Sequence, residues 1–149
     1  MANPGQFTVS RSIDAPIERV FAMLADPDTH PRYDGSGSVR ESETHVVLSD
    51  VGDVFTMRMH RDDLGDFRTD NVVSTFERDA AIGWAPAPAG ESPIGHTFTY
   101  RLDARDKGRT LVTLVYDWSS VTDERVVPRL PMVSAEQLEQ SLELLAQAL

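Results

Sequence analysis

The sequence predicts an α+β fold in which a curved antiparallel sheet of six to seven strands surrounds one long C-terminal helix. Segments that alternate apolar and polar residues follow one another through the chain and are joined by tight turns, as in an antiparallel sheet with one covered face. Two short helices are expected directly after the first strand. The last segment, Ser134–Leu149, has the period of an amphipathic helix about 24 Å long, which needs a broad apolar surface to lie on.

The terminal helix has a recognisable start and an apolar stripe. Ser134 and Gln137 have the spacing of a capping box, in which two side chains satisfy backbone N–H groups that the first turn leaves free. Leucines recur at helical spacing, and we expect one face of the helix to present Leu138, Leu142, Leu145 and Leu149 to the sheet.

The N-terminal part predicts a strand followed by the two short helices. Phe7–Ile13 alternates as a strand does. Pro16 suits the first position of a helix, whose expected buried stripe is Ile17, Val20, Phe21 and Leu24. Two prolines restrict Asp26–Asp34 to a turn or a very short helix.

The remaining strands are expected between turn signals. They are Ser38–Glu43, Val54–Arg61, Phe67–Arg78, Ala80–Ala85, Gly95–Ala104 and Thr110–Ser119. Asp62–Asp66 and Asp106–Gly108 are expected hairpin turns, and a loop at Pro86–Pro93 ends the strand before it. The register of Phe67–Arg78 stays open. Thr122 is expected to cap a short helix that ends before Pro128.

Composition indicates one domain that covers residues 1–149. Apolar residues make up 40% and charged residues 26%, which is typical of a globular protein. No apolar run approaches the length of a membrane span, and Met1–Gln6 shows no signal-peptide pattern, so the cytoplasm is the expected location. The absence of cysteine excludes disulfides, thiolate metal sites and cysteine nucleophiles.

A formal net charge of −10 bears on the partners of the chain. Nucleic acids and anionic membranes both require cationic patches, and no basic cluster occurs, so neither nucleic-acid binding nor membrane insertion is expected. Two interpretations of the acidity remain open: solubility, and an acidic face for a basic protein partner. A homodimer is compatible with the sequence.

The inward face of the expected sheet is rich in large aromatic and deformable side chains. A curved sheet that grips one helix can leave a gap between them, and such a gap becomes an apolar pocket with few polar groups. The expected ligand-binding residues are Tyr33, Phe55, Met57, Met59, Trp84, His96, Phe98, Tyr100, Tyr116, Trp118, Leu138 and Leu142. Each also has a simpler interpretation as a core residue.

The opening segment Phe7–Pro16, followed by Val20-Phe21, Leu24–Pro27 and the strand with Ile82-Gly83-Trp84, resembles the START-like (SRPBCC) superfamily. This helix-grip group includes polyketide cyclases and dehydratases, and the similarity covers nearly the whole chain. The resemblance implies a cavity between the sheet and the last helix, with entrance loops near the short early helices. It is weakly specific for function, because lipid carriers, hormone receptors, cyclases and chaperone regulators share the scaffold. No motif of the cyclases' catalytic residues is present to transfer.

Three residues are candidates for acid–base chemistry. His96 is expected on the same face as Phe98 and could exchange a proton near neutral pH, although the simpler interpretation places it at the mouth of the strand, in solvent or satisfied by a neighbour. Tyr33 is expected near an entrance, where a phenol can hydrogen-bond a ligand carbonyl or pack against a loop. Tyr100 has the same two interpretations.

No metal or cofactor is expected. His60 with Asp62, Asp63 and Asp66 matches no EF-hand or zinc motif, so a solvated hairpin is the better interpretation. Glycine-rich nucleotide motifs and a nucleophile elbow are absent from the sequence.

Three functions therefore remain open. The first is binding of a small apolar or aromatic molecule between the sheet and the last helix. The second is an enzyme of the cyclase, aromatase or dehydratase type. The third is a protein-interaction module like the superfamily's chaperone regulators, which predicts a filled core and an exposed apolar patch.

Overall fold

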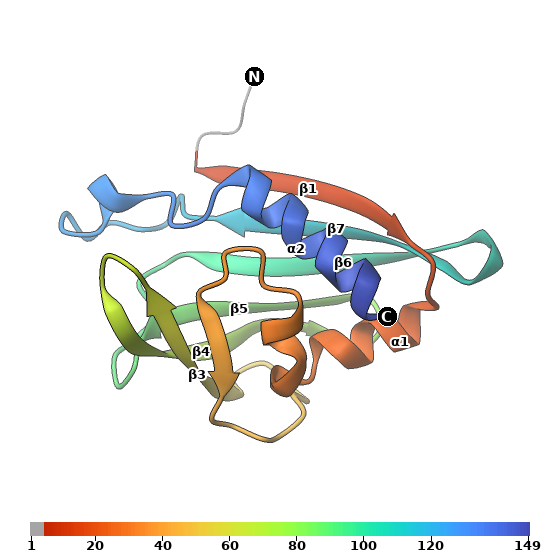
Figure 1. The fold of residues 1–149 in the computed structure, drawn as a ribbon, viewed down its shortest axis with the longest axis horizontal. Coiled ribbons are helices and arrows are strands. Elements are labelled where there is room, and N and C mark those ends of the chain that lie inside the picture. The colour runs from red at the N-terminus through yellow and green to blue at the C-terminus, as the bar shows by residue number, and fades with distance from the viewer. Residues whose placement is uncertain (1–4) are drawn as a thin grey trace.

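A computed structural model describes residues 5–149, so most of Met1–Gln6, where no signal-peptide pattern occurs, lies outside the described residues. A seven-stranded antiparallel sheet curves around the C-terminal helix (Figure 1). The strands are β1 (Gln6–Ile13), β2 (Val39–Ser42), β3 (Val54–Arg61), β4 (Gly65–Glu77), β5 (Ala81–Pro88), β6 (Thr97–Arg105) and β7 (Arg109–Asp117). The helices are α1 (Ile17–Leu24) and α2 (Ala135–Ala148), with 3₁₀ turns η1 (Pro27–Arg32), η2 (Asp106–Gly108) and η3 (Val127–Arg129).

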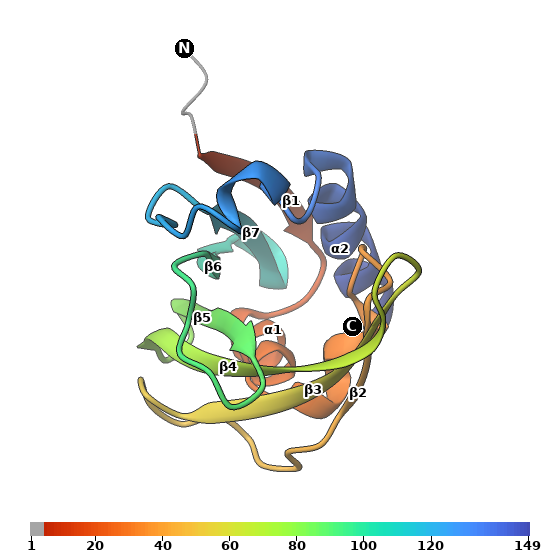
Figure 2. The same ribbon diagram turned by 90° about the vertical axis from the view of Figure 1, so that its left-hand side faces the viewer.

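The strand order β1-β7-β6-β5-β4-β3-β2 places the first strand beside the last. The other strands form a meander, because each pairs with its neighbour in sequence. Viewed along the strands, the sheet curves into an open C, and α2 lies across the open side (Figure 2). The concave face of the sheet is thus enclosed by α2, α1 and η1.

Helix α2 begins and packs as the sequence predicts. The Ser134 hydroxyl accepts a hydrogen bond from the Gln137 N–H, and the Gln137 side chain accepts one from the Ser134 N–H, so both halves of the capping box are present. Leu138, Leu142 and Leu145 are buried, whereas Leu149 at the C-cap is only partly buried. Helix α2 packs mainly on β1, with further contacts to β7 and η1.

The short helices after β1 fill one end of the concave face. Helix α1 buries Val20, Phe21 and Leu24 against β5, β6 and β7. Its N-cap, Pro16, makes no side-chain capping bond. The turn η1 is the very short second helix predicted for Asp26–Asp34, and the Asp26 carboxylate caps it by accepting from the Asp28 N–H.

The register of β4, which the sequence leaves open, places two side chains in the core. Asn71 pairs with Phe55 on β3 and Val73 pairs with Trp84 on β5, and both are buried. An irregularity between Val73 and Thr75 shifts the pairing within this strand. A bulge of this kind is the reason simple alternation fails here, because one extra residue changes which side chains face inward.

Two predictions about local structure are wrong. The strand expected at Ala80–Ala85 continues through Pro86 to Pro88. Strand β6 pairs with β5 only as far as Trp84, so the prolines lie where that edge of β5 is free and no N–H is needed. The helix expected from Thr122 does not form: Asp123 instead accepts hydrogen bonds from Arg125 in a turn, and Pro128 lies inside η3, where its missing N–H costs nothing.

Candidate functional site

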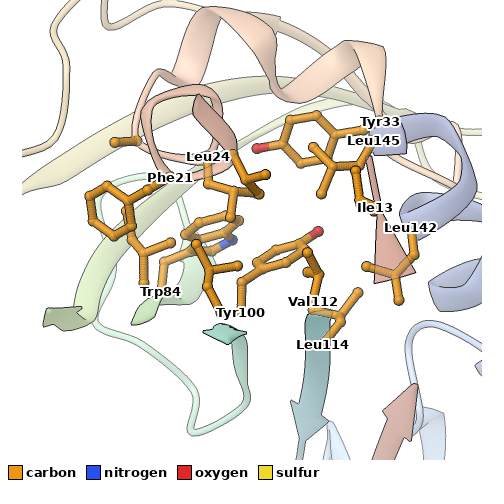
Figure 3. Close-up of a cluster of buried hydrophobic side chains, with 14 of the residues drawn as sticks. Ile13, Phe21, Leu24, Tyr33, Trp84, Tyr100, Val112, Leu114, Leu142 and Leu145 are labelled. Carbon is orange, nitrogen blue, oxygen red and sulfur yellow. The ribbon is translucent and has the colours of Figure 1, made fainter. Parts of the chain in front are cut away.

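Five aromatic rings from four parts of the chain meet between the sheet and the short helices. His30 in η1 stacks on Trp84 of β5 at 4.7 Å between ring centroids, and meets Phe55 of β3 edge to face at 5.2 Å. Tyr33, at the end of η1, contacts His30 at 5.4 Å and Tyr100 of β6 at 6.3 Å. We call these five residues the aromatic cluster. Its four members other than His30 belong to one core with Leu142 and Leu145 of α2, and Figure 3 shows Tyr33, Trp84 and Tyr100 together with these leucines.

His30 is the member of the aromatic cluster that the sequence does not reveal. Its Nε2 lies 2.8 Å from the Leu24 carbonyl oxygen, so Nε2 carries the proton and donates it. Burial lowers the pKa of His30 to about 4, against the smaller opposing effects of that hydrogen bond and of nearby aspartates. The ring is therefore neutral at pH 7. A proline-rich turn has no alternation from which its inward direction could be predicted.

The Tyr33 hydroxyl is buried and has no hydrogen-bond partner among the described residues. Burial raises the pKa of Tyr33 well above its ordinary value, and the nearby Tyr100 raises it further. The Thr29 hydroxyl lies near enough to oppose this rise, but it makes no hydrogen bond to the Tyr33 oxygen and donates its own proton to the carbonyl oxygens of Met23 and Asp26. Tyr33 is thus protonated, and a buried phenol without a hydrogen-bond partner is rare in folded proteins.

Tyr100 approaches the aromatic cluster from the sheet. Figure 3 shows its ring facing that of Tyr33, and both residues are buried. Burial raises the pKa of Tyr100, and the carboxylate of Asp34 raises it further. Tyr100 is therefore also protonated across the physiological range.

The segment that carries Tyr33 is held against α2. The Gly35 N–H donates to the Ser141 hydroxyl at 2.8 Å, and Ser141 is itself buried. A Cβ atom on Gly35 would lie 2.0 Å from the Gln137 carbonyl oxygen, so only glycine permits this approach. Asp34 fixes the rest of the segment by accepting from the backbone N–H groups of Ser36 and Val39.

His96 and Tyr116 belong to a second group of rings. The ring of Phe98 stacks on Tyr116 at 4.4 Å, and the series continues through Trp118 to Phe7. His96 precedes β6 rather than belonging to it, yet it is buried, with Nδ1 2.8 Å from the Tyr116 hydroxyl.

The proton positions in this second group follow from its hydrogen bonds. The Met132 N–H donates to the Tyr116 oxygen at 3.3 Å, so the phenol proton points to Nδ1 of His96, and Nε2 carries the imidazole proton. Burial lowers the pKa of His96 to about 4 and raises that of Tyr116 to about 12. Nδ1 of His96 is thus already engaged. Acid–base roles for His96, Tyr33 and Tyr100 stay predictions.

The other residues predicted to bind a ligand lie in the same core. Phe55, Met57, Leu138 and Leu142 are buried, and Met59, Phe98 and Trp118 pack against them from partly buried positions. Asn71 was missed because the register of its strand was open. Its amide nitrogen donates to the Phe55 carbonyl oxygen at 3.3 Å and to the Thr69 hydroxyl at the same distance.

Two surface hollows lie outside this interior. One, of about 720 Å³, is at the β6–β7 hairpin and includes Arg105, Lys107 and Arg109. The other, of about 340 Å³, is between α2 and β1 and has three glutamates on its α2 side. Of the residues predicted to bind a ligand, only Leu142 borders either hollow. The aromatic cluster lines neither.

The histidine and aspartates of the β3–β4 hairpin pair with one another. Nδ1 of His60 lies 2.7 Å from Asp66 and Nε2 lies 3.3 Å from Asp62, and both carboxylates are exposed. The hydrogen bond to Asp66 is the main reason that the pKa of His60 is raised. Within residues 5–149 no group of three or more such side chains is arranged to hold a metal ion.

The curved sheet, the long helix across it and the short helices after β1 define a START-like helix-grip protein. Within that superfamily the chain belongs to the family described as "Activator of Hsp90 ATPase homolog 1-like protein", whose sequence profile matches residues 14–149.

Relatives and solved structures agree with this assignment. The uncharacterized protein Rv0088 of Mycobacterium tuberculosis is 28% identical over 117 residues, which are 78% of this chain and 49% of that protein. The chain thus spans about half the length of the curated relatives it matches. That residues 1–149 form one START-like domain stays a prediction.

Several solved structures share the fold. Protein Ms6760 of Mycobacterium smegmatis superposes with a TM-score of 0.67 at 19% identity, covering 97% of this chain and 90% of that one. The Aha1 dimer of Colwellia psychrerythraea gives 0.63 at 18% identity, covering 97% and 95%. An Arthrobacter aurescens protein gives 0.68 at 21%, covering 95% and 84%. Across the described part of the chain, no helix has the length and apolar character needed to cross a membrane.

Proposed function

We propose that this protein binds a small, flat, apolar molecule between the concave face of its sheet and α2. The observation that carries the proposal is the aromatic cluster, in which rings from η1, β3, β5 and β6 converge on one place. Ligand sites for such molecules are lined mainly by aromatic and apolar side chains with a few polar groups. The START-like fold to which the chain belongs is, in general terms, a ligand-binding fold.

The route by which a ligand would reach the aromatic cluster follows from the segments that cover the cluster. Tyr33 closes the cluster on the side of α2, and its segment is joined to the helix by the bond from Gly35 to Ser141. The interior side chains contact one another in this structure, so a ligand requires this segment and α2 to move apart. Met57 and Met59 at the other side can adapt to the guest, because methionine is unbranched and flexible.

Calorimetric titration with 2-isopropenylnaphthalene, a flat neutral hydrocarbon, tests this proposal. We expect saturable binding of one molecule per chain and a rise in melting temperature, because a ligand of the native state stabilises it by mass action. Leu142→Trp should abolish binding by filling the space under α2, whereas Gln147→Trp, at an exposed position of the same helix, should not. Circular dichroism establishes that both variants are folded. Absence of saturable binding, or binding that survives Leu142→Trp, would refute the proposal.

A second candidate function is regulation of a chaperone ATPase, in the sense of the family's description. A specific observation favours it: the connection between β2 and β3 exposes apolar side chains to solvent. Val46, Val47 and Val51 are 66%, 59% and 55% exposed, and Val54 at the start of β3 is 50% exposed. Exposed apolar groups gathered in one segment are typical of protein-interaction sites.

The ATPase rate of a purified bacterial Hsp90 tests the second candidate. Wild type should raise the rate, and the double variant Val46→Asp, Val47→Asp should lose this effect, because a charge in a buried interface carries a desolvation cost. Val127→Asp, an exposed valine on η3, is the matched control and should behave as wild type. An unchanged ATPase rate with wild type would exclude this function.

A further inference from the structure

The hairpin between β6 and β7 carries two arginines where its own stability disfavours them. Arg105 and Arg109 are direct cross-strand partners at the point where the hairpin closes. Like charges directly opposite each other destabilise a pair of strands. Both residues are exposed, so packing of the core does not require arginine at either position. A role outside the fold would explain this closing pair.

Lys107, in the turn of the same hairpin, has a backbone conformation that lysine rarely adopts. Its φ is 61°, in the left-handed region. Among the described residues, the other non-glycine residue with a positive φ is Asp79, and aspartate tolerates this conformation. Lys107 is also the only lysine in the sequence. Residues held in such conformations cluster at functional sites.

The three cations border one hollow on the surface. Arg105, Lys107 and Arg109 line the hollow of about 720 Å³ together with Ser12 of β1 and Leu111 of β7. The hairpin extends beyond the end of β1 at one end of the sheet (Figure 1). The volume lies within the range of about 300–1,000 Å³ that is usual for small-molecule sites. The fold thus gathers three cations around one hollow in a chain whose formal net charge is −10.

The acids at this hollow are fewer than the cations. Asp106 of the turn borders the hollow, and the Asp14 carboxylate lies 3.3 Å from Nε of Arg109. The side chains of that ion pair are 52% exposed for Arg109 and 90% exposed for Asp14. Exposed pairs of this kind contribute little to stability, so an anion of higher charge can replace the carboxylate. The hollow therefore favours an anionic ligand.

The kinds of cation indicate which anion the hollow suits. Guanidinium groups bind phosphate through two parallel N–H donors, and the ammonium group of lysine adds a compact charge. A phosphomonoester carries close to two negative charges at neutral pH and has three acceptor oxygens, which three cations match better than they match a carboxylate. A long polyanion such as a nucleic acid would also meet the acidic remainder of the chain, which repels it.

We propose that the hollow at the β6–β7 hairpin binds the phosphate group of a phosphomonoester through Arg105, Lys107 and Arg109. The bound phosphate neutralises the cations whose mutual repulsion weakens the hairpin. This site is separate from the interior site of the proposed function, since no member of the aromatic cluster borders it, and either site can exist without the other. A soluble metabolite and a lipid headgroup can both supply a phosphomonoester.

Glucose 6-phosphate and glucose 6-sulfate are probes of matched shape, because at about pH 7.5 the phosphate ester carries close to two charges and the sulfate ester carries one. In ¹H–¹⁵N NMR titrations of wild type at low ionic strength, glucose 6-phosphate should shift the amide signals from Arg105 to Leu111 in a saturable way. Glucose 6-sulfate should bind about tenfold more weakly, the size expected from the loss of one charge near three exposed cations. Absence of saturable shifts at this hairpin, or equal affinity for the two esters, would overturn the proposal.

The double variant Arg105→Gln, Lys107→Asn removes two of the three cations. Its affinity for glucose 6-phosphate should fall at least about tenfold. Its melting temperature should rise, because like charges no longer face each other and asparagine adopts a positive φ at lower cost than lysine. Arg58→Gln is the matched control and should keep the affinity, because Arg58 is an exposed arginine of β3 that also pairs with a carboxylate, that of Glu41. Affinity retained by the double variant, or a melting temperature no higher than that of wild type, would contradict the proposal.

Vesicle flotation decides whether the phosphate belongs to a soluble molecule or to a lipid headgroup. Phosphatidylcholine vesicles that contain phosphatidic acid present a phosphomonoester, whereas those that contain phosphatidylglycerol present a diester with a single charge. Flotation with phosphatidic acid that glucose 6-phosphate competes away assigns the site to a lipid headgroup. No flotation, together with binding in solution, assigns it to a soluble phosphomonoester. Equal flotation with phosphatidylglycerol would show an unspecific anionic-surface contact and overturn the proposal.

Discussion

Tyr33 and Tyr116 are both buried tyrosines, yet their hydroxyl groups have opposite surroundings. The Tyr116 hydroxyl donates to His96 and accepts from the Met132 N–H, which ties β7 to the segment before α2. The Tyr33 hydroxyl has no partner among the described residues. The same chemical change at the two positions should therefore change stability in opposite directions.

Tyr33→Phe should raise the free energy of unfolding by about 1 kcal/mol, because it removes a buried donor that is not paired. Tyr116→Phe should lower it by about 1–3 kcal/mol, because it leaves the Met132 N–H and His96 without their partner. Urea unfolding of the two variants measures both effects. A loss of stability in Tyr33→Phe as large as that in Tyr116→Phe would show that the Tyr33 hydroxyl is paired in solution.

At the scale of residues, sequence reasoning finds those whose direction is set by strand alternation. Phe55, Met57, Tyr100 and Tyr116 follow the period of their strands and are buried as predicted. His30 does not, because the prolines around it leave no periodicity. That Tyr33 meets Tyr100 is equally invisible in the sequence, since contacts between side chains far apart along the chain depend on the fold of the whole.

At the scale of elements, helix α2 shows which features are determined by residues close together in the sequence. Its capping box and its leucine spacing lie within sixteen residues, and the structure confirms both. The end of β5 was predicted wrongly because it depends on a non-local partner, and the helix after Thr122 because Asp123 accepts hydrogen bonds from Arg125 in a local turn. Strand β5 continues past its prolines only because β4 pairs along its whole length.

Leu142 and Glu143 are adjacent on α2 and test its orientation. Leu142→Ala should lower the free energy of unfolding by about 2–5 kcal/mol, because the side chain is 1% exposed and its loss leaves a cavity. Glu143→Ala should change it by no more than about 0.5 kcal/mol, because Glu143 is only half-buried and borders the surface hollow between α2 and β1. Denaturant unfolding compares the two variants. Equal effects would show that the leucine stripe does not face the sheet.

At the scale of the whole molecule, two buried neutral histidines make stability depend on pH. The pKa values of His30 and His96 are about 4 in the folded state, below the ordinary value of 6.5. Between these pH values the unfolded chain binds protons that the folded protein does not. The stability that the two neutral histidines contribute is therefore fully present above pH 6.5 and is lost as the pH falls toward 4. His60, with a raised pKa, acts in the opposite direction: its contribution is lost as the pH rises.

Lowering the pH from about 7 to about 5 should therefore reduce the free energy of unfolding by about 2 kcal/mol for each buried histidine. Urea midpoints at the two pH values measure the loss. NMR titration of the histidine ring protons assigns it: His30 and His96 should stay neutral over this range, whereas His60 should titrate above its ordinary pKa. Ring protons of His30 or His96 that titrate near 6.5 would contradict the burial described for them.

The overall architecture could be predicted because turn signals and periodicity repeat along the entire chain. Whether the interior has room for a ligand could not be predicted from the sequence, because it depends on the summed volumes of side chains from many segments. The residues expected to line a pocket do meet in one core, with His96 bonded to Tyr116 beside it.

The most direct test of the central claim is to locate a bound apolar molecule by NMR. Intermolecular nuclear Overhauser effects between 2-isopropenylnaphthalene and the isotope-labelled protein report which protons lie within about 5 Å of the probe. We predict contacts to the rings of Trp84 and Tyr100 and to the methyl groups of Leu142, which enclose the proposed site. Contacts confined to the exposed valines Val46, Val47 and Val51, or no contacts at all, would contradict a ligand site between the sheet and α2.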